Sequence, residues 1–398
     1  MYFRAIRIQK VYKYKLCPNA TQKGVFRRWL GTCRFVYNLC LEHRICHWQS
    51  TGQGLSEYSQ NRDLTLVKKE PGFEWLNEPH SQVLQDVVRR VSLSFEHFFR
   101  GAGFPKWASK HSWHSFRFPQ AHNNSIRIEG SRLRLPKVGW VKFYYHRQCE
   151  GCIKQVTVKK QAGAYFACIL VEQCHDPVPA SESQAVGIDL GIARLATLST
   201  GEWYANPKLF QRFGPEVKRL QRKLSRQEYQ SNGWKKTKRR LSRVHAKAKR
   251  CRQDYLHKAS TAIVRKYPAL VVEQLQLQNM SRSARGTVSR PGKRVRCKSG
   301  LNRSLRDVGL GQFLEMLEYK CRWNGRSFKR VYPRYTSQKC ANCGHTSPEN
   351  RPTQAQFRCV NCGQADHADI NASKNIRDLG RISGSQYGQS LRVLPVSA

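Results

Sequence analysis

Hydrophobic spacing divides the first hundred residues into one strand and two helices. Apolar and basic residues alternate over residues 2–15, which predicts a β-strand. Over residues 19–50, and again over residues 80–99, apolar positions recur every three or four residues, so both stretches are predicted to be amphipathic helices. We therefore expect a helical lobe over residues 15–100.

Short strands separated by glycine and proline turns are predicted after residue 101. They fall at residues 125–128, 133–135, 141–146, 153–159 and 164–171. This pattern indicates a small β-barrel. Because the first strand precedes the helices, we expect the helical lobe to be inserted into the barrel.

The second half of the chain alternates apolar strands with helices, after a Pro/Ser linker at residues 176–184. The pattern predicts strands at 185–192, 195–199 and 269–273, a helical pair over 216–267 broken near Ser231, and a helix over 305–322. Residues 379–398 are rich in Gly and Ser and are expected to be a flexible tail. The chain as a whole is predicted to be an α/β multi-domain protein.

Charge narrows the class of partner. The 398 residues include 71 Lys and Arg against 26 Asp and Glu, a formal net charge of +45 at pH 7. A hydrophobic content of 39% is too high for a disordered basic tail, so this is a folded protein. Such an excess of positive charge favours a polyanionic partner, nucleic acid above all.

The chain shows no run of 18 or more apolar residues and no signal-peptide pattern at its start, so we expect a cytoplasmic protein without a membrane partner. Its 15 cysteines are an odd number, sparse in a long sequence. Reduced thiols and one metal site fit this usage better than a disulfide framework.

Positive charge is concentrated in two segments. Residues 218–258 hold sixteen Lys and Arg against Glu228 and Asp254, which favours contact with a nucleic-acid backbone over a merely solvated face. Residues 281–300 hold seven basic residues and no acid, and are expected to be mobile until nucleic acid binds. The candidate contacts in the first segment are Lys235, Lys236, Lys238, Arg239 and Arg240.

Two C-x2-C pairs separated by fifteen residues predict a zinc ribbon at residues 339–363. Four thiolates close a tetrahedral coordination sphere, so the single Zn²⁺ would be structural. Cys149 and Cys152 have the same spacing without a second pair nearby, and are interpreted as ordinary thiols. The four expected zinc ligands are Cys340, Cys343, Cys359 and Cys362.

Three carboxylates lie within or at the ends of predicted elements. Asp189 lies between Gly187 and Gly191 in a strand, which would leave room for a hydrated metal and a phosphodiester; Glu273 ends a strand, and Asp369 begins a helix. Each has an ordinary structural explanation, such as a capping role for Asp369. Together they could hold two Mg²⁺ or Mn²⁺ ions for phosphodiester hydrolysis, but the sequence does not show that they converge.

An ordered series of motifs resembles TnpB, the transposon-encoded relative of the type V CRISPR effectors. The motifs are GIDLGI at 187–192, VEQL at 272–275, YTSQKCANCG at 335–344, CVNCG at 359–363 and DINASKNI at 369–376. YKYKLCP at 12–18 and CRFVYN at 33–38 resemble the N-terminal module of that family. The resemblance covers residues 2–378.

The resemblance implies a RuvC-like nuclease domain of RNase H fold, with the zinc ribbon inserted, behind a wedge β-barrel that carries a helical recognition lobe. The corresponding ranges are 185–338 and 364–378 for the nuclease, and 1–14 and 101–175 for the barrel. Asp189, Glu273 and Asp369 would then be the catalytic metal-binding triad. Two departures are Gln274, where Asp often follows the Glu, and His367, where many relatives have Asp.

The resemblance also implies partners: a guide RNA transcribed from the transposon end, and double-stranded target DNA cut beside a short motif, at the prokaryotic nucleoid. A monomer is expected. The resemblance also implies that the helical lobe and barrel recognise the short DNA motif. In this region Gln85, Asn123 and Asn124 carry side-chain amides that could bind base edges, although an ordinary role as surface amides is at least as common.

Two other functions remain open from the sequence. A non-catalytic nucleic-acid-binding regulator of transposition would also be basic and carry a zinc ribbon. A DDE-type transposase would share the RNase H-like fold and an acidic triad, but the position of the ribbon just before Asp369 disfavours it.

Overall fold

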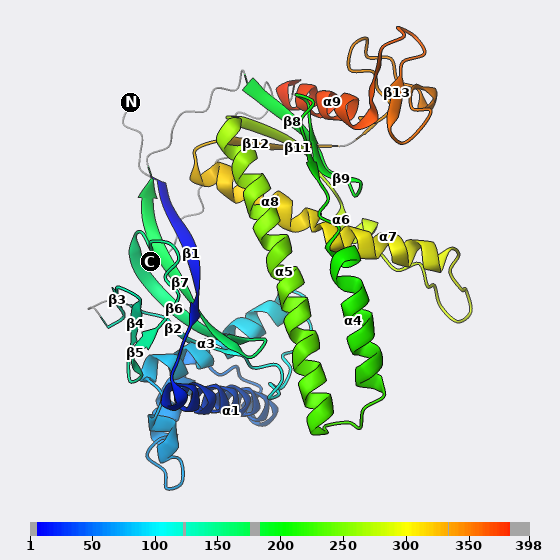
Figure 1. The fold of residues 1–398 in the computed structure, drawn as a ribbon. Coiled ribbons are helices and arrows are strands. Elements are labelled where there is room, and N and C mark those ends of the chain that lie inside the picture. Colours follow the sequence, from blue (N-terminus) through cyan, green and yellow to red (C-terminus); the bar gives the residue numbers. More distant parts are fainter. Residues whose placement is uncertain (1–5, 122–124, 176–183, 333, 383–398) are drawn as a thin grey trace. The chain divides into compact units, whose positions relative to one another are not determined.

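The computed structural model describes residues 6–121, 125–175, 184–332 and 334–382. They belong to two compact units, Ile6–Cys174 and the part that starts at His175 (Figure 1). Both units mix helices with β-sheet, and the described residues form four sheets in all. None of the described helices is long and apolar enough to cross a membrane.

The first unit is built on a four-stranded sheet of order β1-β7-β6-β2 and a three-stranded sheet of order β3-β4-β5. An antiparallel bridge from Leu16 to Phe143 links the end of β1 to the residue after β5. The strands are β1 (Ile6–Leu16), β2 (Ser115–Phe118), β3 (Ile128–Glu129), β4 (Arg132–Leu135), β5 (Gly139–Lys142), β6 (Cys152–Gln161) and β7 (Ala164–His175).

Helices α1 (Ala20–Thr51), α2 (Glu57–Val67) and α3 (Ser81–Phe99), with the short η1 (Glu74–Asn77), come between β1 and β2 in the chain. The helical segment is therefore inserted between two strands of one sheet. The Asn19 side chain caps α1 by accepting from the Gln22 N–H at 2.8 Å, and the Gln22 side chain accepts in return from the Asn19 N–H at 3.1 Å. Trp29 of α1 is fully buried against Phe116 of β2.

The second unit contains a five-stranded sheet of order β10-β9-β8-β11-β12. β9 runs antiparallel to β8, whereas β11 runs parallel to both β8 and β12, and Val271 of β11 pairs with Gly187 of β8. The strands are β8 (Ala185–Asp189), β9 (Arg194–Leu198), β10 (Trp203–Ala205), β11 (Ala269–Glu273) and β12 (Ser327–Val331).

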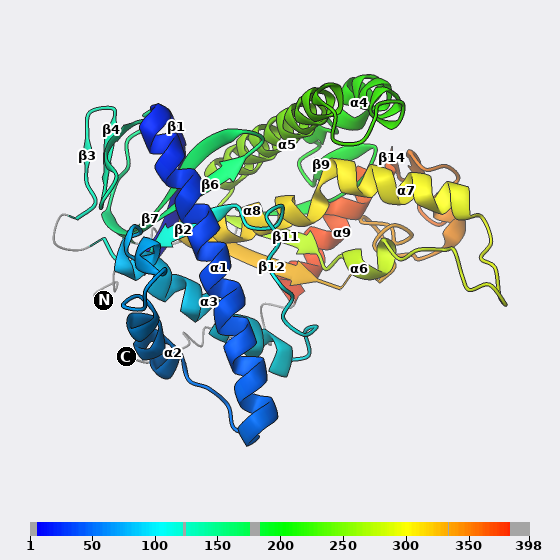
Figure 2. The ribbon, with the colours of Figure 1, turned by 90° about the horizontal axis from the view of Figure 1, so that it is seen from below.

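Helices cover both faces of this sheet (Figure 2). Ile188 and Val272 pack with α5 (Asn232–Lys266) and α8 (Leu310–Trp323) on one face. Val271, one residue earlier in β11 and so on the opposite face, packs with Ile376 of α9 (Ala368–Ile382). Burial of both faces explains why these strands are apolar throughout and do not alternate with polar residues.

The helical pair breaks where the sequence predicts, between α4 (Leu209–Ser225) and α5, and the Ser231 hydroxyl caps α5 by accepting from the Trp234 N–H at 3.1 Å. The helix expected over 305–322 is instead two helices, α7 (Val295–Val308) and α8. Gly309 separates them with φ at 77°, a left-handed conformation that ends α7.

Two other segments differ from expectation. Residues 281–300 include the start of α7, and Gly286 forms a bridge with Pro291, after the short α6 (Leu277–Met280). The mobility of this segment stays a prediction. Helix α9 continues to Ile382, so residues 379–382 belong to the helix and not to the expected tail; residues 383–398 lie outside the described part.

Candidate active site and zinc module

Helix α9 lies directly on β8 at Gly187. A Cβ at this position would lie 1.9 Å from the Ser373 carbonyl oxygen and 2.6 Å from the Arg377 nitrogen, so only glycine permits the approach. The expectation that Gly187 leaves room for a metal and a phosphodiester is wrong, because the helix backbone occupies that space. This glycine sets the distance between helix and sheet.

The packing of α9 on β8 brings three carboxylates to one end of the sheet. Asp189 follows Gly187 by two residues and lies on the same face, and Asp369 precedes Ser373 by four residues, about one helical turn. Glu273 likewise follows Val271, the residue paired with Gly187, by two. Because two strand residues and one helical turn each span about 6 Å, all three acids reach the carboxyl ends of β8 and β11.

Burial and neighbouring negative charge both act on Asp189. Burial raises the pKa of Asp189 to about 7, and the negative charges of Glu273 and Asp369 add to the increase. Burial also raises the pKa of Glu273. The Thr336 hydroxyl donates to Glu273 Oε1 at 2.8 Å, and this hydrogen bond lowers that pKa and so offsets part of the increase. The sequence left open whether the three acids meet, and the structure brings them into one acidic cluster.

Arg351 and His367 flank Asp369. Arg351 Nη2 lies 3.7 Å from Asp369 Oδ1, and His367 Nδ1 lies 3.9 Å from Oδ2. The Asp369 N–H donates to His367 Nδ1 at 3.2 Å, which makes this ring nitrogen the acceptor. Sequence reasoning assigned no role to Thr336 or Arg351, although Thr336 stands in the motif just before Cys340 and Arg351 in the spacer between the cysteine pairs.

The acidic cluster suits a hard divalent cation. Its donors are carboxylate oxygens, which Mg²⁺ prefers, and a bound cation would favour the charged form of Asp189, whose pKa is raised by burial and by the neighbouring acids. The ligand atoms of the three acids do not all lie within 4.8 Å of one another. Among the described residues, only the four cysteines form a group of three or more metal-ligand side chains that meets this criterion.

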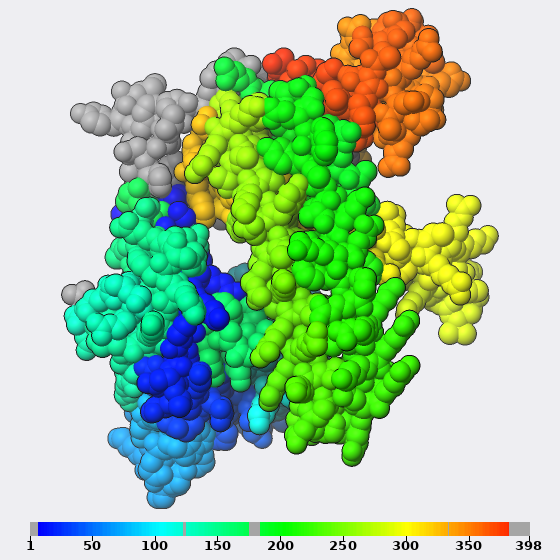
Figure 3. All heavy atoms as spheres, in the orientation of Figure 1, coloured from blue at the N-terminus to red at the C-terminus, as the bar shows by residue number. Residues whose placement is uncertain are grey.

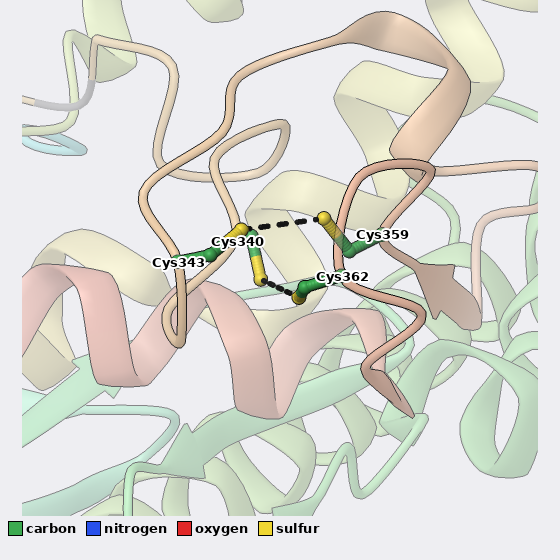
Figure 4. Close-up of side chains that lie close together, drawn as sticks. All are labelled: Cys340, Cys343, Cys359 and Cys362. Carbon is green, nitrogen blue, oxygen red and sulfur yellow. Dashed lines mark hydrogen bonds between the residues drawn. The ribbon is translucent and has the colours of Figure 1, made fainter.

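The four cysteines form a compact thiol cluster (Figure 4). Cys340 Sγ lies 3.8 Å from Cys362 Sγ, and Cys343 Sγ lies 3.6 Å from Cys359 Sγ. Tetrahedral zinc with bonds of about 2.3 Å requires sulfur separations of roughly 3.8 Å, so the cluster fits a structural Zn²⁺. A hydrogen bond from the His345 backbone lowers the pKa of Cys343 to about 6, which favours the thiolate that zinc binds.

Both cysteine pairs use the same turn. The Cys340 N–H donates to the His345 carbonyl at 2.8 Å, and the Cys359 N–H donates to the Gln364 carbonyl at 2.9 Å. Gly344 and Gly363 follow the pairs with φ at 78° and 70°, a conformation that favours glycine. The module also contains η3 (Pro348–Asn350), β13 (Gln356–Arg358) and β14 (Ala365–His367).

Side-chain amides of α9 fasten this module to the helix that carries Asp369. Asn371 accepts from the Ala341 N–H at 2.9 Å and donates to the Lys339 carbonyl at 2.8 Å. Asn375 donates to the carbonyls of Thr336 and Lys339 at 2.9 and 2.7 Å. Both asparagines are buried, so the zinc module and the acidic cluster share one hydrogen-bonded framework.

The remaining candidate residues are placed as follows. Gln85 is exposed on α3, while Asn123 and Asn124 lie outside the described residues. Burial raises the pKa of Cys149, and within the described residues neither it nor Cys152 belongs to a metal-binding group. All five basic candidates of α5 are exposed: Lys235, Lys236, Lys238, Arg239 and Arg240.

Three known protein families match segments of this chain. Residues 168–284 match a family described as "Probable transposase" (OrfB_IS605), and residues 311–376 match a "Cas12f1-like, TNB domain". Residues 7–53 match a family described as a helix-turn-helix domain. In this chain the structure of that segment is different: it contains strand β1 and the single helix α1.

The chain is 39% identical to "Putative RNA-guided DNA endonuclease InsQ" of Escherichia coli (strain K12), over 93% of this chain and 92% of that protein. It is 30% identical to a "Putative RNA-guided DNA endonuclease" of Streptomyces pristinaespiralis, over 97% and 92% of the two chains. A solved Cas12f1 structure, from a complex with guide RNA and target DNA, aligns with a TM-score of 0.56 at 13% identity, covering 93% of this chain and 99% of that one.

Fold and thiol cluster together define a mixed α/β protein of Cas12f-like fold with a four-cysteine module near its C-terminal end. The similarity to InsQ, 39% identity over 93% of this chain, identifies the family. The chain belongs to the IS605 OrfB/TnpB family.

Proposed function

We propose that this protein is an RNA-guided DNA endonuclease encoded by a transposon, which takes its guide RNA from the transposon end and cuts target DNA beside a short adjacent motif. The observation that carries the proposal is the acidic cluster of Asp189, Glu273 and Asp369 within a strongly basic chain. The printed names of two relatives support the same activity. As expected from the sequence, the protein would work in the cytoplasm, at the nucleoid.

In this proposal the second unit is a RuvC-like nuclease of RNase H fold. Support comes from its sheet, in which β8 lies between antiparallel β9 and parallel β11, with α9 packed across β8. Asp189, Glu273 and Asp369 would hold two Mg²⁺ or Mn²⁺ ions, which supply an activated water and stabilise the leaving oxygen during phosphodiester hydrolysis.

The surrounding side chains have separate tasks. Thr336 orients the Glu273 carboxylate through its hydrogen bond at 2.8 Å. Arg351 supplies positive charge beside Asp369, at a position where it can meet a phosphate oxygen. Asn371 and Asn375 join the zinc module to α9, and the bond of Arg351 to the Gln354 carbonyl holds Arg351 within the module.

The first unit would then be a wedge barrel with its inserted helical recognition lobe. The insertion of α1, α2 and α3 between β1 and β2 supports this assignment, and exposed Gln85 remains a candidate for reading the adjacent motif. The exposed basic residues of α5 remain candidates for contact with the nucleic-acid backbone: Lys235, Lys236, Lys238, Arg239 and Arg240.

The test combines purified protein, its co-expressed RNA, Mg²⁺ and DNA that carries a sequence matched to the RNA. Cleavage should follow a changed guide sequence, and should be lost in Asp189→Asn while RNA binding persists. Asp378→Asn is a matched control, since Asp378 lies on the same helix α9 but is engaged by Arg377 at 2.8 Å. It should cleave normally.

Other outcomes would favour the alternative functions. RNA or DNA binding without cleavage at any divalent metal would support a regulator of transposition. Joining of DNA ends to a new target would support a DDE-type transposase, and either result would overturn the proposal.

A further inference from the structure

Two histidines lie one turn apart near the end of α1. His43 and His47 are four residues apart, a spacing that places both imidazoles on one face of a helix. Their ring centroids are 6.4 Å apart, and the ring planes are inclined by 78°. The same spacing holds two zinc ligands in the H-E-x-x-H helix motif, so this face of α1 offers a pair of nitrogen donors.

Helix α2 adds a carboxylate to this pair. Asp63 Oδ2 lies 3.9 Å from His43 Nδ1, and the two side chains are 31% and 43% exposed. In Figure 3 both α1 (dark blue) and α2 (light blue) reach the surface of the first unit. Two imidazoles and one carboxylate therefore form an open group that ions in solution can reach. This group of His43, His47 and Asp63 is here called the α1–α2 cluster.

The register of the two helices is fixed beside this cluster. Gln60 of α2 is buried, and its amide donates to the Cys40 carbonyl of α1 at 2.8 Å. The same side chain accepts from Arg44 Nε at 2.7 Å. Asp63 follows Gln60 by three residues, about one helical turn, so these bonds hold it opposite His43. A site with ligands on both helices thus needs little movement of the backbone.

The α1–α2 cluster is slightly wider than a bound ion requires. Its three ligand atoms do not all lie within 4.8 Å of one another. On a tetrahedral ion with bonds of about 2.0 Å, the nitrogen and oxygen would be roughly 3.3 Å apart and the two ring centroids about 5.2 Å apart. Side-chain rotation that closes the cluster by about 1 Å meets both values. At 3.9 Å, His43 and Asp63 are not hydrogen-bonded, so this closure breaks no bond between them.

The donor set determines the type of metal. Imidazole nitrogen suits Zn²⁺, Cu²⁺ and Ni²⁺, whereas Mg²⁺ and Ca²⁺ prefer oxygen ligands alone. Three protein ligands leave the fourth position of a tetrahedral ion to water. The cluster therefore differs in chemistry from the three carboxylates of the second unit and from its four thiols.

We propose that His43, His47 and Asp63 bind one divalent transition-metal ion such as Zn²⁺, which joins α2 to α1. This site is separate from the acidic cluster and from the four cysteines, and it does not depend on the proposed function. Because its ligands are exposed, the ion exchanges readily and is lost to a chelator. When bound, it adds a link between two helices that are connected in the chain by residues 52–56.

The test measures metal binding by the full chain purified with its RNA. Dialysis against EDTA empties the exposed sites, and native mass spectrometry checks that the zinc of the four cysteines stays. Zn²⁺ is then titrated by isothermal calorimetry in millimolar Mg²⁺, which saturates RNA phosphates and carboxylate sites. The melting temperature is followed in parallel, because an ion that binds only the folded chain raises it.

The native protein should bind one Zn²⁺ ion more per chain than the double variant His43→Ala, His47→Ala, with a dissociation constant in the micromolar range. Asp63→Asn, which preserves side-chain size, should weaken this binding by roughly tenfold or more. Bound Cu²⁺ should show nitrogen splitting in its electron paramagnetic resonance spectrum, and the double variant should lose this signal. The matched control, His97→Ala with His111→Ala, replaces two exposed histidines of the same unit and should bind as the native protein does.

Equal zinc binding by the native protein and the double variant would overturn the proposal. Binding that begins only at millimolar zinc, or an equal loss in the control, would also overturn it. A melting temperature that zinc does not raise would contradict the link between the helices. Melting temperatures without added zinc check that each variant folds. Since no measurement involves DNA cleavage, failure of this proposal and failure of the proposed function are distinguishable.

Discussion

Arg351 Nη2 lies 3.7 Å from Asp369 Oδ1, so the zinc module contributes a positive charge to the acidic cluster of the sheet. The same guanidinium donates to the Gln354 carbonyl at 2.9 Å, which fixes its position within the module. It also acts against the rise in the pKa of Asp189 that burial causes. The module is therefore electrostatically part of the site and not only a structural addition to it.

The first prediction follows from this pair. Arg351→Ala should lower the rate of DNA cleavage by roughly a hundredfold or more, because it removes the positive charge beside Asp369 that, in the proposed function, meets the phosphate. Single-turnover cleavage measures the effect, with RNA and zinc content expected to stay normal. Arg358→Ala, at an exposed arginine of the same module, is the control, and equal rates for both variants would contradict the role of Arg351.

A second prediction concerns the helix–sheet contact. Gly187→Ala should lower the free energy of unfolding by about 3 kcal/mol or more and impair cleavage, because its Cβ would lie 1.9 Å from the Ser373 carbonyl and push α9 away from β8. Gly300→Ala, in α7 with no atom within 4 Å of the added Cβ, should be neutral or stabilising by up to about 1 kcal/mol. Denaturant titration compares them; equal stability of the two variants would show that α9 yields easily.

The third prediction is metal removal. Cys359→Ser should abolish the bound zinc of the purified protein and reduce cleavage, because loss of the module frees Asn371, Asn375 and Arg351 from their positions. Mass spectrometry of the native protein measures zinc, and limited proteolysis detects opening of the module. The exposed Cys46 offers a control, since Cys46→Ser should retain zinc and activity. Full zinc content in Cys359→Ser would contradict the four-cysteine site.

The fourth prediction uses the buried Lys320 of α8. Burial, with a contribution from Arg265, lowers its pKa from 10.5 to about 8, although its ammonium donates to Ser260, Thr261 and the His257 carbonyl. Between pH 8 and 10.5 the unfolded chain binds the extra proton, so stability should rise with pH through this window. The gain is at most about 3 kcal/mol, because the three accepting oxygens favour the charged form.

Comparison with Lys320→Met isolates this contribution. As pH rises from 8 to 10.5, the unfolding free energy of the native protein should increase relative to that of the variant. Denaturant titrations of the reduced proteins at several pH values measure it. A difference that does not change with pH would show that the lysine keeps its ordinary pKa in the folded protein.

Much of the local structure was predictable from the chain. The long helices α1 and α3, the break before α5 and strand β11 follow from hydrophobic spacing, and the family follows from the ordered motifs. The division of one expected helix at Gly309 was not predictable in this way, because apolar periodicity continues across it while the backbone turns left-handed. Hydrophobic spacing does not reveal the backbone conformation of a single residue such as Gly309.

The acidic cluster shows the same limit on a larger scale. The sequence alone determined that Glu273 ends a strand, that Asp369 begins a helix and that four cysteines are spaced for zinc. It placed Asp189 inside a strand predicted to run to residue 192, whereas β8 ends at Asp189. Only the tertiary structure decided that Glu273 and Asp369 lie near enough to Asp189 to raise its pKa, that Arg351 lies beside Asp369, and that Gly187 serves helix packing and not metal access. Local spacing fixes which face of an element a side chain occupies, whereas these distances depend on how α9 packs across β8, far apart in the chain.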